Sequence, residues 1–587
     1  MAMTQAEQQR QVKQAEELLF SGPQCMGFAK GLFFGRFVSD WVMPFPYLPD
    51  SIRSDVYSSV DEVRCFLDET LDAERIDRQA DIDPEVIEGL ARLGVLGMTA
   101  PTSYGGRGFS QQGYCQVLEQ LGARCAATSI FVNAHHSIGI RALLLFGTEE
   151  QKARWLPALV RGDELAAFAL TEVNAGSDAA NVQTHAELSD DGSHYILNGD
   201  KRYITNGSIA RVLTVMARTP LPDKPGEFGV TAFLVTPDME GFQVTEPRMD
   251  KLGIRGTATA KLAFNNMCVP VGNVLGEVGK GLKVALTVLD FGRTTFGACC
   301  TGAATKCLEL AVSHARERQQ FGQAIGEFEL VRKKIAKMAA WTYAMEAMSQ
   351  TTASLIDRGL EDYMLETAML KVYTTEALWE IVNDAFQIHG GAAYFKGHAL
   401  ERMLRDARIN QIGEGANDVL MSFIALVGMR GPGEELMDVW HALHHPLSEL
   451  RKVWRFGVDR IDHAVHTPEV PVQSYAMRGF ARDLGSRIKQ FNQAVVRSLI
   501  KHGETILDRQ LVQERIARIA MELFACACVV SRADAELVAR ENLEDAAADP
   551  AAVYFLNAAN RRIDGWLEEI RTNDDDSMLQ AAQFAMM

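Results

Sequence analysis

The residues from about 166 to 275 differ in character from the rest of the chain, and they limit what it can fold into. Three turn-type dipeptides separate short runs with strand character: Asp191-Gly192, Asn198-Gly199 and Asn206-Gly207. Further strands are predicted at 213–217, 231–235 and 261–264. On both sides of this region apolar residues recur at helical spacing. The pattern predicts a small antiparallel β domain inserted between helical regions.

The complete order is helix, β, helix, followed by a further helical region. Apolar stripes in the last part predict at least two amphipathic helices, one through Ile488, Phe491, Val495 and Leu499 and one through Val512, Ile516, Ile519 and Leu523. Gly431-Pro432-Gly433 is interpreted as a linker. We therefore expect a mainly α chain with these parts: an extension 1–50, a helical domain 51–165, a β domain 166–275, a helical bundle 280–430 and an additional helical domain 434–587.

Composition excludes several classes of function. The net charge of -17 argues against a nucleic-acid-binding protein, which needs a basic face. Ten cysteines show no CxxC spacing with partner histidines, so we expect reduced thiols, a reducing compartment and no metal site. We see no apolar run of the ~20 residues that span a bilayer. The acidic N-terminus resembles neither a secretory signal nor a transit peptide, so we expect either a cytoplasmic protein or a mature form, and we favour a cytoplasmic location.

Two segments offer chemistry. Glu414 lies between two glycines in the run 412–418, IGEGAND. Upstream, the polar loop 168–178, FALTEVNAGSD, combines small residues that let backbone N–H groups approach a ligand with the hydroxyls of Thr171 and Ser177. Taken alone, a glutamate in a glycine turn is more often a solvated carboxylate, and a Gly/Ser/Asp loop is more often a simple turn.

These segments, with NGDKRYITNG at 198–207, RQQFG at 318–322 and QIHGG at 387–391, resemble in order and spacing the flavin-dependent acyl-CoA dehydrogenases. The resemblance covers roughly residues 25–580. It implies that family's fold, with a helical N-domain, a β middle domain and a four-helix-bundle C-domain. It also implies FAD as cofactor, acyl-CoA as substrate and an electron-transferring flavoprotein as electron acceptor.

The resemblance assigns the cofactor contacts in two groups. Contacts within one subunit fall on Phe168, Leu170, Thr171, Gly176, Ser177, Tyr203, Ile204 and Thr205. Contacts from the neighbouring subunit fall on Arg318, Gln320, Phe321, Gln387, Gly390 and Gly391, and further cofactor contacts fall on Ala416, Asn417 and Asp418. For Arg318 the chemistry agrees, since a guanidinium fork suits a pyrophosphate.

Glu414 is the implied catalytic base, which removes the α-proton of the thioester. Some family members carry the base on an earlier helix instead, but Gly292 stands at that position here. The implied substrate-binding residues are Ser177, Arg255, Asp290, Arg293, Gly413 and Gly415. Family members usually have Tyr or Phe where Gly413 stands, Thr where Ala416 stands, Pro where Val173 stands, and Trp or Phe where Tyr203 stands. The first two departures lie at the turn that carries Glu414.

The extra C-terminal domain resembles the subgroup that acts on very long acyl chains in β-oxidation, which implies a homodimer and inner-membrane association. A stripe of Leu447, Leu450, Trp454, Val458 and Ile461 with nearby basic residues suits a membrane surface, although core packing is the commoner role. An acyl-CoA oxidase that uses O₂ and a respiratory-complex assembly protein are the alternatives. Since no matching chemistry follows Gly431, we expect a chain truncated after Gly433 still to desaturate acyl-CoA.

The adjacent His135 and His136 are interpreted as core or pocket-lining residues. Two neighbouring histidines on a regular helix cannot both face one ion.

Overall fold

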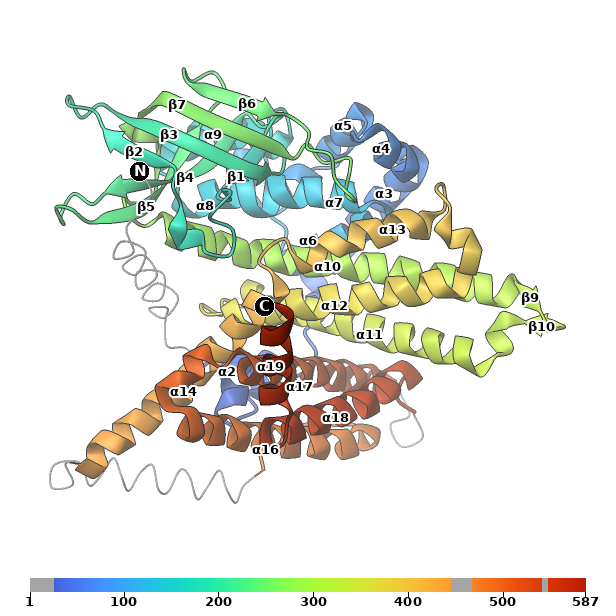
Figure 1. Ribbon diagram of the computed structural model, residues 1–587. Helices are drawn as coiled ribbons and strands as arrows, with labels where there is room; N and C mark the ends of the chain where they lie inside the picture. Colours follow the sequence, from blue (N-terminus) through green and yellow to red (C-terminus); the bar gives the residue numbers. More distant parts are fainter. Residues whose placement is uncertain (1–25, 445–466, 541–546) are drawn as a thin grey trace. The chain divides into compact units, whose positions relative to one another are not determined.

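The computed structural model describes residues 26–444, 467–540 and 547–587 (Figure 1). These residues form two compact units. The first unit contains Leu48–Val331 and Thr374–Gly415, and the second contains residues 26–47, Arg332–Tyr373 and the described residues from Ala416 onward. The predicted order of helix, β, helix and additional helices is confirmed.

The first unit begins with helices. They are α3 (Asp50–Thr70), α4 (Ala73–Gln79), α5 (Pro84–Arg92), α6 (Gln111–Arg124), α7 (Ala126–Val132), α8 (Arg141–Phe146) and α9 (Glu149–Arg161). Thr148 caps α9 through a reciprocal capping box with Gln151, which satisfies two backbone N–H groups.

An eight-stranded sheet follows. Its strands are β1 (Ala166–Ala169), β2 (His185–Leu188), β3 (His194–Ile204), β4 (Val212–Pro220), β5 (Phe228–Val235), β6 (Phe242–Glu246), β7 (Ala260–Pro270) and β8 (Val274–Leu275). The order is β6-β7-β3-β2-β4-β5-β8, and β1 pairs with β4. Five strand pairs are antiparallel, while β1 and β2 pair with β4 in parallel. The antiparallel prediction thus holds for most of the sheet.

Two of the three glycine dipeptides form the predicted turns, and one does not. Asp191-Gly192 connects β2 to β3, and Asn206-Gly207 ends β3. Asn198-Gly199 lies inside β3, where the register with β7 shifts by a bulge. There the Asn198 side-chain oxygen accepts a hydrogen bond from the backbone N–H of Asn266 at 2.7 Å. Glycine within a strand marks a bulge as readily as a turn, which explains the wrong prediction.

Helix α10 (Gly281–Glu317) is the longest element of the first unit, and its N-terminal part packs against the sheet. Apolar side chains of α8, α9 and α10 meet those of β4 and β5 in one core. The unit also contains the small hairpin β9 (Gln319–Gln320) and β10 (Gln323–Ala324), the C-terminal part of α12 (Met364–His389), and α13 (Ala399–Arg408).

A π-helical stretch, Asn133–Ile140, joins α7 to α8. With its flanking helices it makes a continuous segment, Ala126–Phe146, that is long and apolar enough to span a bilayer. The sequence analysis did not identify this segment. Its most apolar window is 67% buried inside the protein, as expected for a core helix. π-Helical turns widen a helix locally and often occur at functional sites.

The second unit is helical throughout its described part. It consists of α2 (Phe28–Phe33), α11 (Glu329–Asp357, from Arg332), the start of α12, α14 (Asn417–His444), α16 (Arg478–His502), α17 (Gln510–Val538), α18 (Pro550–Arg571) and α19 (Asp575–Ala585). The two helices predicted from the stripes at 488–499 and 512–523 are α16 and α17. The stripe at 447–461 lies outside the described residues.

The predicted linker at Gly431-Pro432-Gly433 is wrong, because α14 runs through it. An ideal Cβ at Gly431 would lie 2.5 Å from the Phe34 ring, and one at Gly428 would lie 2.1 Å from the Phe33 ring. These glycines therefore let the Phe33 and Phe34 rings approach α14 closely, and they do not serve as a flexible linker. Phe33 also packs edge-on against Phe491 of α16, at 5.0 Å between ring centroids.

Half-buried polar contacts tie the later helices to α11. Arg532 of α17 lies over the Tyr343 ring at 4.0 Å and forms an ion pair with Glu346 at 2.8 Å. Arg562 of α18 lies over Trp341 at 4.4 Å and pairs with Glu522. The C-terminal helices thus share one packed core with α2, α11 and α14.

The burial of Glu366 in α12 predicts that the stability of the folded protein depends on pH. Its carboxylate accepts a hydrogen bond from the Ala29 N–H at 2.8 Å, and burial raises its pKa from 4.5 to about 7. Between these pH values the unfolded carboxyl ionises while the folded one keeps its proton, so the stability that Glu366 contributes falls as the pH rises. Because of Glu366, the free energy of unfolding of the wild type should fall by up to about 3 kcal/mol between these pH values, and the Glu366→Gln variant should lack this fall. Urea unfolding at pH 5 and pH 7 measures the free energy of unfolding of the wild type and the variant. If this free energy changes equally with pH in both proteins, the prediction is wrong.

Candidate active site

Glu414 lies in a left-handed turn between the short helix Ile409–Gln411 and α14. Its φ is 59°, and that of Gly415 is 98°. A non-glycine residue in this conformation is strained and persists only where its surroundings hold it, a situation frequent at active sites. The backbone N–H groups of Ile412 and Gly413 both donate to the Ile409 carbonyl at 2.9 Å, which closes the turn from one side.

Helix α10 holds the turn from the other side. Arg293 Nε donates to the Glu414 carbonyl oxygen at 3.4 Å, and Arg293 Nη1 donates to Asp290 at 3.0 Å. Both side chains are more than nine-tenths buried. In the structure these two predicted substrate-site residues orient the turn that carries Glu414.

Gly292 faces the glutamate carboxylate. An ideal Cβ at Gly292 would lie 3.3 Å from Glu414 Oε2 and 3.1 Å from Ile138 Cγ1. The absence of a side chain at Gly292 therefore lets the Glu414 carboxylate lie close to the backbone of α10, and Ile138, presented by the π-helical stretch, packs against the same point. Gly413 has no positive φ and an ideal Cβ there meets only the Ile409 carbonyl, at 3.7 Å, so the backbone does not require glycine.

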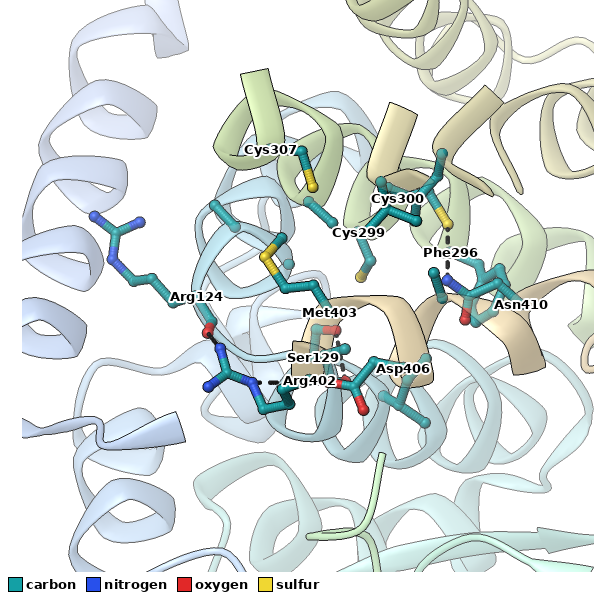
Figure 2. Close-up of a pocket in the computed structure, with 18 residues that line it drawn as sticks. Arg124, Ser129, Phe296, Cys299, Cys300, Cys307, Arg402, Met403, Asp406 and Asn410 are labelled. Atoms are coloured by element: carbon teal, nitrogen blue, oxygen red, sulfur yellow. Dashed lines mark hydrogen bonds and ion pairs between the residues drawn. The ribbon is translucent and has the colours of Figure 1, made fainter. Parts of the chain in front are cut away.

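A pocket with a cavity volume of about 30 Å³ begins one helical turn beyond Gly292 (Figure 2). Its walls come from α6, α7, α10, α12 and α13, and the lining includes Ile130, Phe296, Cys299, Cys300, Ala303, Cys307, Leu378, Val382 and Met403. Burial raises the pKa of the Cys299 and Cys307 thiols to about 12, so both stay neutral and behave as small apolar groups. The pocket is mainly apolar.

The polar part of the lining consists of Arg124, Ser129, Arg402, Asp406 and Asn410. Asn410 donates to Cys300 Sγ at 3.6 Å. Asp406 Oδ1 accepts a hydrogen bond from the Ile254 N–H at 2.5 Å, and burial raises the Asp406 pKa to about 6. This contact fixes the loop that carries Arg255.

Arg255 forms an ion pair with Asp250 at 3.9 Å. Its Nε is buried and has no hydrogen-bond partner within the described ranges. The substrate contact expected of Arg255 stays a prediction.

The first group of predicted cofactor residues is brought together around β1. Phe168 and Leu170 project to the same side, while Ala167 and Ala169 point into the sheet core. Thr171 is half-buried, Gly176 and Ser177 are exposed, and an ideal Cβ at Gly176 meets nothing within 4 Å. Tyr203 has a φ of 61° and is 55% exposed. The Ile204 side chain is buried in the sheet, so only its backbone faces a ligand. Thr205 is half-buried.

The second group gathers at the far end of α10. The His314 ring stacks on the His389 ring with centroids 4.2 Å apart, and His398 contacts His389 at 5.1 Å. This stack places Arg318, one helical turn after His314, near Gln387, Gly390 and Gly391, all of which are exposed. Gln320 is also exposed, and Phe321 is 93% exposed.

The residues after Glu414 behave differently from one another. Asn417 is buried and its amide oxygen accepts a hydrogen bond from Lys371 Nζ at 2.8 Å. Ala416 is half-buried and Asp418 is exposed.

The predicted core role of the histidine pair is confirmed, since both rings are fully buried. His135 contacts the Leu159 carbonyl and accepts from the Ala166 N–H, whereas His136 accepts from the Thr99 N–H. Nine cysteines of the described ranges are free thiols, and these ranges contain no group of three His, Cys, Asp or Glu side chains suited to a metal ion.

Sequence reasoning missed several residues that organise the site: Ile138, Glu172, Lys201 and the histidine stack. One signal was available for Lys201. It shares the inward side of β3 with Tyr195 and Leu197 at a period of two, so it should have been predicted as a buried lysine. Ile138 and the histidine stack depend on contacts between distant segments.

The donor set fits a flavin dinucleotide. Two hydroxyls and an open glycine backbone stand beside β1, and exposed Arg318 and two glycines with open space in front of them stand at the end of α10. These groups suit a ring system and a pyrophosphate respectively.

Comparison with known proteins agrees with the family resemblance of the sequence motifs. The chain matches the models "Acyl-CoA dehydrogenase, N-terminal domain" over residues 58–163, "middle domain" over 167–267 and "C-terminal domain" over 279–428. Residues 476–585 match "ACAD9/ACADV, C-terminal domain".

Three similar proteins illustrate the extent of the match. The human very long-chain specific acyl-CoA dehydrogenase is 35% identical over 87% of this chain and 79% of its own length. The probable acyl-CoA dehydrogenase FadE10 of Mycobacterium tuberculosis is 32% identical over 97% of this chain and 90% of its own. The acyl-CoA dehydrogenase of Bacillus anthracis, solved with FAD, has a TM-score of 0.79 and 28% identity over 94% of both chains. The chain belongs to the acyl-CoA dehydrogenase family of FAD-dependent oxidoreductases, which act in fatty acid β-oxidation.

Proposed function

We propose that this protein desaturates long-chain or very-long-chain acyl-CoA to the trans-2-enoyl-CoA, with Glu414 as the base. The observation that carries the proposal is the strained Glu414 turn, held by Arg293, with its carboxylate against Gly292 and an apolar pocket beginning one helical turn away. The bound FAD would accept the hydride from the β-carbon.

Glu414 removes the α-proton of the thioester and keeps it on its carboxyl group. Thioester α-protons are too weakly acidic for a carboxylate in water, so donors aimed at the thioester oxygen must stabilise the enolate. The Glu414 N–H, in its left-handed turn, is proposed as one such donor.

The lining of the pocket suits an acyl chain, but its volume of about 30 Å³ holds only two or three water molecules, so a long chain would have to widen it. Its lining on α10 extends from Phe296 to Cys307, a rise of about 16 Å along the helix. Small and apolar residues along this length suit an extended hydrocarbon chain.

The length of α10 supports a homodimer. Arg318 follows Arg293 by 25 residues along a helix that ends at Glu317, which separates them by about 38 Å. A flavin whose ring lies near Glu414 cannot extend to Arg318 of the same chain. The groups at the far end of α10 are therefore proposed to bind the FAD of a second subunit. Peripheral membrane contact and a cytoplasmic location are further proposals, the latter supported by the free thiols.

Anaerobic titration tests the reaction and the acceptor. The purified protein should be yellow with about one FAD per chain, and palmitoyl-CoA should bleach the flavin at a stoichiometry near one. Subsequent addition of electron-transferring flavoprotein should restore the colour faster than O₂ does. Fast recovery with O₂ alone would indicate an oxidase, and no bleaching with any acyl-CoA would indicate an assembly protein. Parallel titration with butyryl-CoA tests the chain length, and equal bleaching at equal concentration would contradict the long-chain proposal.

A further inference from the structure

Glu172 and Lys201 form a buried ion pair for which the proposed reaction has no use. Lys201 Nζ lies 2.6 Å from Glu172 Oε1, and their side chains are 0% and 6% exposed. Burial lowers the pKa of Lys201 to about 8, against the opposing effect of Glu172. Removing two charges from water is costly, and such pairs often contribute no net stability. Stability alone therefore does not account for this pair.

The pair holds the loop 168–178 from its inner side. Lys201 Nζ also donates to the Leu170 carbonyl at 3.0 Å. The Glu172 carboxylate accepts hydrogen bonds from the Gln183 N–H at 2.6 Å and the Thr184 N–H at 3.1 Å. All hydrogen bonds here involve a charged group, and these are the stronger kind.

Two backbone contacts complete the arrangement. The Arg202 N–H donates to the Thr171 carbonyl at 2.9 Å, and the Glu172 N–H donates to the Ala175 carbonyl at 3.0 Å. Three successive residues, Leu170, Thr171 and Glu172, are thus each fixed from the protein side. The outer side of the loop keeps the Thr171 and Ser177 hydroxyls and the open backbone at Gly176.

We propose that Lys201 and Glu172 are positioning residues that hold this loop in the shape that binds the flavin. The inference rests on the proposed placement of FAD against residues 168–178. Neither side chain touches the cofactor. Each fixes groups that do, so that the loop loses little freedom when FAD binds.

The test uses the holoenzyme and follows FAD release by the rise of flavin fluorescence after dilution. The variants are Lys201→Met, Glu172→Gln and the double variant. The double variant leaves no unpaired charge in the interior, so its effect reports the loss of positioning. We expect FAD release at least about tenfold faster in all three, because a hydrogen bond to a charged group is lost. The absorption spectrum of the flavin that remains bound should also shift.

A matched control removes another largely buried pair, Arg562–Glu522, by Arg562→Met with Glu522→Gln. This control should lower the melting temperature without changing the FAD release rate or the flavin spectrum. Wild-type release and spectrum in the double Lys201/Glu172 variant would overturn the inference. The inference would also be overturned if the control released FAD faster in proportion to the fall in its melting temperature.

Two further variants separate this inference from the proposed flavin site. Thr171→Val and Ser177→Ala alter groups on the outer side of the loop. If they speed FAD release while the Lys201/Glu172 variants do not, only the positioning role fails. If none of the variants alters FAD release, the placement of FAD on this loop fails as well.

Discussion

Replacement of Glu414 by glutamine is expected to abolish flavin reduction by acyl-CoA almost completely while FAD and acyl-CoA remain bound. Glutamine keeps the size of the side chain and leaves the backbone contact from Arg293 to the Glu414 carbonyl in place. It cannot accept the α-proton. Loss of a positioned base costs about 10²–10⁴-fold in rate. Stopped-flow reduction with palmitoyl-CoA measures the effect, and reduction at the wild-type rate would show that Glu414 is not the base.

Moving the carboxylate to position 292 gives the matching gain-of-function test. Gly292 faces the Glu414 carboxylate, so the Glu414→Gly/Gly292→Glu variant would place a carboxylate in the space that the Glu414 side chain vacates. We expect it to recover part of the activity lost in Glu414→Gly. Recovery should be incomplete, because an ideal Cβ at position 292 lies only 3.1 Å from Ile138. The Ile138→Val substitution should therefore improve the double variant, and no recovery in either background would contradict the shared-space argument.

Truncation after Gly433 is expected to yield no soluble flavoprotein, contrary to the expectation from sequence. The cut removes α16, α17 and α18, which bury Phe491, Phe524 and Phe555 among many apolar side chains. Each buried side chain of this size contributes about 1.5–3 kcal/mol, so the loss far exceeds the net stability of an ordinary domain. The cut would also expose the partners of these helices on α2 and α11. Soluble expression and flavin content measure the outcome.

Truncation after Asn573 is the control. It removes only α19, none of whose residues is buried, and breaks the ion pair between Arg515 and Asp575. This shorter chain should stay soluble and keep its flavin. A soluble, active chain ending at Gly433 would show instead that the C-terminal helices fold as an independent domain.

Short-range patterns predicted the elements and their chemistry well. The helical stripes at 488–499 and 512–523 and the strands at 213–217 and 231–235 all depend on residues close together in the chain. Periodicity is a local property, so sequence alone reveals it. The same applies to Gly415, whose left-handed conformation in the Glu414 turn suits glycine whatever surrounds it.

Glycine was the residue whose role the sequence could not settle. Gly199 forms a bulge and Gly431 admits the Phe34 ring, although both were interpreted as breaks in the chain. A glycine tolerates a turn, a bulge or a close approach equally well, and the neighbour that decides among them lies far away in sequence.

The sequence by itself determined the order of the elements, the family motifs and the identity of the one carboxylate that serves as the candidate base. Only the tertiary structure decided that Arg293 holds the Glu414 turn, that Ile138 limits the space at Gly292, and that Lys201 and Glu172 fix the loop at 168–178. Each of these contacts joins residues separated by about 30 to 150 positions. Their formation depends on burial and packing between elements, which local propensity does not encode.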